Sequence, residues 1–117
     1  MPLGTLMLLE AATFLVAASV HSGFFIPGQE HREARIAETV IAGVLVAGGL
    51  MALGNPAWAR RAALAAQGFA LVGTIVGMTM ILIGIGPQGA LELVYHVTIA
   101  AVLVFGLVTA ARQRRVA

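Results

Sequence analysis

The sequence contains neither cysteine nor lysine, and these two absences remove several classes of protein. Without cysteine there are no disulfides, no thiolate metal sites and no thiol catalysis. Without lysine, the positive charge rests on seven arginines, set against five acidic residues. So few and so dispersed basic groups do not make a nucleic-acid interface, and we expect no nucleic-acid partner.

Charged residues of any kind are scarce. They make up 10% of the chain, whereas a soluble domain carries about 25%, and hydrophobic residues make up 60%. The mean hydropathy is +0.97. A chain with so little polar surface cannot cover itself against water, so we expect the lipid bilayer to be its solvent. The predicted protein is a multi-pass integral membrane protein, of a bacterial inner (plasma) membrane.

Four apolar stretches are long enough to cross the hydrocarbon core, which takes about 20 residues. Their predicted bounds are about 3–25, 33–53, 56–85 and 88–111, with proline or glycine at the breaks. The first stretch has no basic residue before it and contains Glu10, so we expect a retained span rather than a signal peptide. The short connections predict one all-α domain over residues 1–117, a four-transmembrane-helix bundle of up-down-up-down topology.

Arginines set the predicted orientation of this bundle. Those on the side shared by both termini are Arg60, Arg61, Arg112, Arg114 and Arg115, and those on the other side are Arg32 and Arg35. Cytoplasmic loops carry the excess of basic residues, so five arginines against two place both termini in the cytoplasm.

Small residues recur four positions apart in two of the expected helices. Gly73 and Gly77 form such a step in the third, and Gly43 and Ala47 in the second. These faces let helix backbones approach closely in lipid. We expect them to pack inside the bundle, with a homodimer through either face as the alternative.

Histidines and acids gather toward the outer side of the expected bundle. His21, Glu38, Met78 and His96, one from each helix, fall one to two turns from the outer end, and Glu92 lies just above. Imidazole and carboxylate groups suit a divalent transition metal, and His21 with His96 would suit a haem with two axial imidazoles. The sequence therefore predicts an outward-side pocket inside the bundle that binds a haem, a metal ion or a small ligand.

Two other interpretations of these residues stay open. Glu38 could pair with Arg35, and Glu92 with His96, as hydrogen-bonded pairs that satisfy each other near the membrane interface. In an enzyme acting on a lipophilic substrate, His96 and Glu92 would be the acid and base. No nucleophile motif accompanies them, so the sequence does not decide whether the protein is an enzyme.

The connection between the first two helices is the most polar stretch of the chain. It includes Glu30 and His31 and continues to Glu33 and Arg35. We expect either a solvated turn or a loop that controls access to the pocket.

Glu10 and Gln67 form a separate polar level, about two turns from the cytoplasmic end of their helices. A carboxyl group so deep in the bilayer needs a partner, and Gln67 lies at matching depth. The pair predicts either a proton-coupled transporter or channel for a small molecule or ion, or a hydrogen bond that joins two helices. A third hypothesis is an accessory or scaffold subunit of a larger membrane complex.

Overall fold

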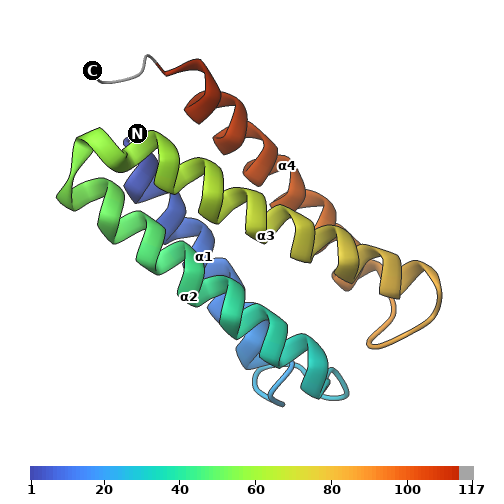
Figure 1. Cartoon of the computed structure of the whole chain (residues 1–117). Helices are drawn as coiled ribbons and strands as arrows, with labels where there is room; N and C mark the ends of the chain where they lie inside the picture. Colours follow the sequence, from blue (N-terminus) through green and yellow to red (C-terminus); the bar gives the residue numbers. More distant parts are fainter. Residues whose placement is uncertain (114–117) are drawn as a thin grey trace.

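The computed structural model describes residues 1–113, and these fold into long helices joined by short connections (Figure 1). The helices are α1 (Leu3–Val20), α2 (Arg32–Gly54), α3 (Ala59–Leu82) and α4 (Ala90–Arg112), with a 3-10 turn η1 (Pro56–Trp58) before α3. All four long helices are apolar enough and long enough to cross a membrane, which confirms the prediction of four such helices. Arg114 and Arg115, which entered the orientation argument, lie outside the described residues.

Two helices end earlier than the sequence predicts. α1 ends at Val20 because the chain turns there: the amides of His21 and Phe24 donate to the carbonyls of Ala17 and Ser19 at 2.9 and 3.1 Å. Gly23 follows with a φ of +101°, a conformation that costs glycine little. α3 likewise ends at Leu82, before a glycine with positive φ. His21 therefore lies just beyond α1 rather than within it.

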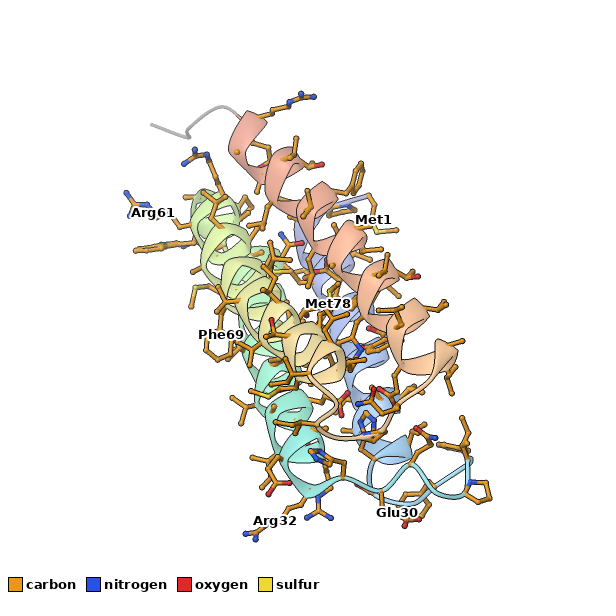
Figure 2. All side chains as sticks on the ribbon, turned by 90° about the vertical axis from the view of Figure 1, so that its right-hand side faces the viewer. Met1, Glu30, Arg32, Arg61, Phe69 and Met78 are labelled. Carbon is orange, nitrogen blue, oxygen red and sulfur yellow. The ribbon has the colours of Figure 1, made fainter. Side chains whose placement is uncertain are left out.

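The turn between α2 and α3 has the local chemistry that the sequence indicates. Oδ1 of Asn55 accepts a hydrogen bond from the amide of Ala57 at 3.2 Å, and Pro56 opens η1. The guanidinium of Arg61 lies 5.2 Å from the ring centre of Trp58, a cation–π contact. Figure 2 shows Arg61 and Met1 at one end of the bundle and Glu30 and Arg32 at the other.

Each helix packs against its neighbour in sequence, and α1 makes less extensive contacts with α3 and α4. The α1–α2 and α3–α4 connections lie at one end of the molecule, and the α2–α3 turn lies at the other (Figure 1). Leu45 of α2 and Leu103 of α4 are fully buried in the core between the helices. The looser contact of α1 with α4 leaves space between these two helices, and this space matters for the site.

The distribution of polarity is the reverse of a soluble protein. Large apolar side chains such as Leu15, Leu50, Val72 and Phe105 are exposed on all four helices. Among residues 1–113, six polar or charged side chains are buried instead: Glu10, His21, Glu38, Gln67, Thr74 and Glu92. An apolar exterior is stable where lipid is the solvent, and polar groups then find their partners inside.

The small-residue steps have different surroundings. A Cβ on Gly73 would come within 2.7 Å of Ile41, and one on Gly77 within 2.9 Å of His96, so this step serves packing inside the chain. Gly43 and Ala47 are exposed, and a Cβ on Gly43 would meet no atom within 4 Å. A homodimer stays a prediction, and the exposed step is the one that the fold leaves free for it.

Candidate functional site

Three buried side chains from different parts of the chain meet at the end of the bundle that holds the α1–α2 connection. Nδ1 of His21 lies 2.5 Å from Oε1 of Glu38, and Nε2 of His21 lies 2.8 Å from Oε1 of Glu92. The three residues are only 4%, 6% and 6% exposed. We refer to them as the His21 cluster. Figure 2 shows nitrogen and oxygen atoms gathered between the helices near this end.

The cluster has a defined protonation pattern. A carboxylate can only accept hydrogen bonds, so a ring that contacts two of them donates from both nitrogens and is an imidazolium. The hydrogen bond that the ring donates to Glu38 raises the pKa of His21 to about 9, although burial acts in the opposite direction, and Glu92 contributes a further increase. When both carboxyl groups are ionised, the imidazolium balances one of them and the cluster has one excess negative charge.

The backbone of the connection holds His21 in place. Its amide donates to the carbonyl of Ala17, and its own carbonyl accepts a hydrogen bond from the amide of His31 at 3.0 Å. The end of α1 and the start of α2 are thereby tied together across the loop. Because both of its backbone groups are engaged, the imidazole enters the bundle from a fixed point.

His96 of α4 stands beside the cluster with one free nitrogen. Its Nδ1 lies 2.7 Å from the carbonyl oxygen of Glu92, and a carbonyl only accepts, so Nδ1 carries the hydrogen. Nε2 of the neutral ring is therefore an unprotonated acceptor. It faces Gly77 of α3, where a glycine gives the ring room. Oε2 of Glu92 lies 4.0 Å from Nδ1 of His96.

His31 has the opposite arrangement. It is the N-cap of α2, and its Nδ1 accepts a hydrogen bond from the amide of Ala34 at 3.1 Å. In the neutral ring the hydrogen is then on Nε2, which lies 3.8 Å from Oε2 of Glu33. The ring thus caps a helix with one nitrogen and presents a donor with the other.

These groups lie in the wall of a cavity of about 380 Å³ between α2, α3 and α4, whose other lining residues are apolar or glycine. We call it the polar cavity because it holds these ionisable side chains. All three histidines line it, together with Glu33 and Glu92. No arginine is among the described residues that line it, so the fixed charges of the carboxylates are balanced there only by histidine. Such a cavity offers acceptors and negative charge to whatever enters it.

A second, apolar cavity of about 400 Å³ lies between α1 and α4. Its walls include Val16, Ala17, Val20, Ile26 and Leu91. His21 and Glu92 line this cavity as well, so the two hydrogen-bonded side chains belong to the walls of both spaces.

Comparison of the chain with protein-family models, with curated proteins and with solved structures found no match. The site is therefore interpreted from its own geometry.

Most of the residues predicted for the outer pocket lie at this site. His21, Glu38 and Glu92 are in direct contact, and His96 lines the same cavity as His21. Met78 is half-buried on α3 and is not among the residues lining the polar cavity, whereas Met80 is. Within residues 1–113, no three or more His, Asp or Glu side chains are arranged to hold a metal ion.

One of the two alternative pairings differs from what the sequence indicated. Glu38 pairs with His21 instead of Arg35, which is exposed. His96 hydrogen-bonds the backbone carbonyl of Glu92, and its Nδ1 also lies 4.0 Å from the Glu92 carboxylate, at the limit of an ion pair. Of the four residues predicted to control access, His31 and Glu33 line the cavity, whereas Glu30 and Arg35 are exposed and are not among its lining residues.

Sequence reasoning missed Tyr95 and Thr13, which line the inner part of the apolar cavity. The Tyr95 hydroxyl lies 3.5 Å from Oγ1 of Thr13, and its ring packs edge-to-face on Phe14 at 6.2 Å and on His96 at 5.6 Å. The available signal was the spacing, because Tyr95 follows Leu91 by one turn and therefore continues the same helix face.

Glu10 and Gln67 are both buried, at 1% and 0% exposure, but make no hydrogen bond to each other. Gln67 donates to the carbonyl of Ala63 at 3.2 Å. Its Oε1 and both carboxylate oxygens of Glu10 have no hydrogen-bond partner in the described part of the chain. The predicted pair is thus not formed, and three acceptor oxygens are left in the core.

Proposed function

We propose that this chain is a membrane-embedded binding protein whose His21 cluster and polar cavity take up a small cationic ligand. The proposed topology is up-down-up-down with both termini in the cytoplasm, as the distribution of arginines favours. The site then opens on the outer side. The observation that carries the proposal is the His21 ring, held between the buried carboxyl groups of Glu38 and Glu92 at the wall of a cavity.

The charge of the site selects the ligand class. An excess negative charge in a low-dielectric interior is costly unless a cation pairs with it. Glu92 and Glu33 supply carboxylate oxygens at the cavity, and Nε2 of His96 supplies a neutral acceptor. An ammonium group has donors for all of these and no acceptor that would need a donor in return. A small amine therefore fits the chemistry of the lining.

A haem or a metal ion is the other ligand class that the histidines favour. His21 has no lone pair to give to a metal while both ring nitrogens donate to carboxylates. Coordination through His21 would break one of these bonds, whereas His96 has a free nitrogen. An absorption spectrum and elemental analysis of protein purified from membranes read out these two ligands directly.

The test is a titration with methylammonium of the full chain in lipid nanodiscs, followed through the imidazole ¹⁵N resonances of the histidines. We expect the His96 signal to shift with saturation, and Glu92→Gln to weaken binding at least tenfold. Glu33→Gln is a milder second variant, since that side chain is 77% exposed and its replacement does not disturb the core. Glu30→Gln, exposed outside the cavity lining, is the matched control. Unchanged binding in both cavity variants would contradict the proposal.

A second candidate function is proton-coupled transport through Glu10. It is favoured by the fact that both carboxylate oxygens are buried without a partner, as in membrane proton relays that use such acids. Uptake of a radiolabelled amine into proteoliposomes driven by a pH gradient is the measurement. Loss of uptake in Glu10→Gln, with binding at the His21 cluster intact, supports it, and full uptake by that variant excludes this role.

A further inference from the structure

The two cavities share part of their walls, and this arrangement indicates more about the ligand than its charge. His21 and Glu92 line both spaces and are bonded to each other through Nε2 and Oε1 at 2.8 Å. On one side of this pair the lining includes three histidines and two glutamates among apolar residues of α2, α3 and the α3–α4 connection. On the other side it is aliphatic. A molecule seated at the pair therefore meets a polar and an apolar environment at the same time.

The apolar cavity is suited to a hydrocarbon chain. Valine, alanine, isoleucine and leucine side chains form its wall, and the Tyr95 and Thr13 hydroxyls at its inner part lie 3.5 Å from each other. Val16 and Leu91 on its rim are 59% and 55% exposed, so the space borders on the lipid-facing surface of α1 and α4. An apolar chain can reach it from the bilayer without crossing water.

The polar cavity, in contrast, is suited to a cationic headgroup. Oε2 of Glu92 lies 4.0 Å from Nδ1 of His96, so the carboxylate and the imidazole stand next to each other at the junction. Because Nδ1 of His96 donates to the Glu92 carbonyl, Nε2 is the acceptor whenever the ring is neutral. An anionic headgroup would face Glu33 and Glu92 with no arginine among the described lining residues to offset the repulsion.

We infer that the ligand of this site is an amphiphilic amine, with its ammonium group at Glu92 and His96 in the polar cavity and its alkyl chain in the apolar cavity. This inference rests on the proposed function, because it names the class of cation that the His21 cluster binds. It adds that the protein recognises the alkyl chain of the ligand as well as its positive charge.

The experiment uses a ten-carbon primary amine with a photoreactive diazirine at the chain end, added to the full chain in nanodiscs and mapped by mass spectrometry after irradiation. We expect labels on the wall of the apolar cavity, at residues such as Val16, Val20 and Leu91. Decylamine should compete for this labelling, and decanol, with the same chain and no charge, should compete at least tenfold less well. Equal competition by decanol would overturn the inference, because the apolar cavity would then bind an alkyl chain whether or not it carries an ammonium group.

Two variants distinguish binding of the ligand's alkyl chain from binding of its ammonium headgroup. Val16→Trp fills the rim of the apolar cavity from a lipid-exposed position and should reduce labelling at least fivefold while leaving methylammonium binding unchanged. Val72→Trp is the matched control, because Val72 is 63% exposed on α3, outside the lining of both cavities. Equal labelling in Val16→Trp and Val72→Trp would overturn the inference. Where Val16→Trp does not fold, the competition between decylamine and decanol in the unmodified chain decides alone.

Failure of the inference and failure of the proposed function give different results. Methylammonium binding without labelling of the apolar cavity would retain the cationic site and exclude the amphiphile. Absence of both would exclude the two together.

Discussion

Two buried polar regions of this bundle differ in how their groups are paired. In the His21 cluster, one imidazole joins two carboxylates at 2.5 and 2.8 Å. In the region of Glu10 and Gln67, three oxygens are equally buried and have no hydrogen-bond partner among residues 1–113. Burial of a polar group is therefore a poor guide to its role. The pairing shows which group stabilises the fold and which carries an uncompensated cost.

The largest effect should come from removing the centre of the paired region. His21→Leu leaves two carboxylates buried without a counter-charge, so we expect the free energy of unfolding to fall by about 3–5 kcal/mol. Reversible unfolding in mixed micelles measures it. Glu30→Gln, which removes an exposed charge near the same loop, should change it by less than about 0.5 kcal/mol. A loss below about 1 kcal/mol in His21→Leu would show that the cluster does not stabilise the bundle.

The pH dependence of stability sharpens the same contrast. Since the folded-state pKa of His21 is raised to about 9 from an ordinary value of 6.5, its contribution is fully present below pH 6.5 and is lost as the pH rises through 9. We expect a decrease of about 1–3 kcal/mol between pH 6 and pH 10. Unfolding at a series of pH values measures it. Glu38→Gln removes the main cause of the raised pKa and should flatten the profile, and an equally steep profile in that variant would contradict the assignment.

The unpaired region should respond in the opposite direction. Glu10→Leu replaces a carboxyl group that has no partner with an apolar side chain, so we expect the free energy of unfolding to rise by about 1–2 kcal/mol. The same micelle assay applies, with Glu10→Gln as the polar control that retains an unpaired group. A loss of stability in Glu10→Leu would show that Glu10 has a partner outside the described contacts. The two regions would then not differ in whether their polar groups are paired.

The smallest effect is expected between the two regions, at Tyr95. Tyr95→Phe removes a hydroxyl whose contact to Thr13 is 3.5 Å, at the limit of a hydrogen bond, and keeps the ring that packs on Phe14 and His96. We expect a loss of less than about 0.5 kcal/mol. Tyr95→Ala, which also removes the ring, is the comparison. A loss above about 1.5 kcal/mol in Tyr95→Phe would indicate a stronger hydroxyl bond than the geometry shows.

Composition and turn residues were sufficient to predict four apolar helices and most of their bounds, because the length of a span and the behaviour of glycine and proline are local properties. Helix faces also placed His21, Glu38 and Glu92 toward one end. The partner of each group could not be predicted in this way, since it depends on the rotation of one helix against the next. Arg35 was the nearer residue in sequence for Glu38, yet the imidazole of His21 is its partner. The same holds for Gln67, which has matching depth to Glu10 but donates to its own helix.

The ring of His31 links the shape of the polar cavity to the first turn of α2. One of its nitrogens accepts from the amide of Ala34, and the ring also forms part of the cavity wall, next to Gly86. The His31 ring cannot move outward to admit a larger ligand unless its hydrogen bond to the Ala34 amide breaks and the first turn of α2 unwinds. The N-terminus of α2 thus limits the width of the polar cavity on this side. Substitutions at His31 would change the size of ligand that fits, whereas substitutions at Glu92 and Glu33 would change the charge that is bound.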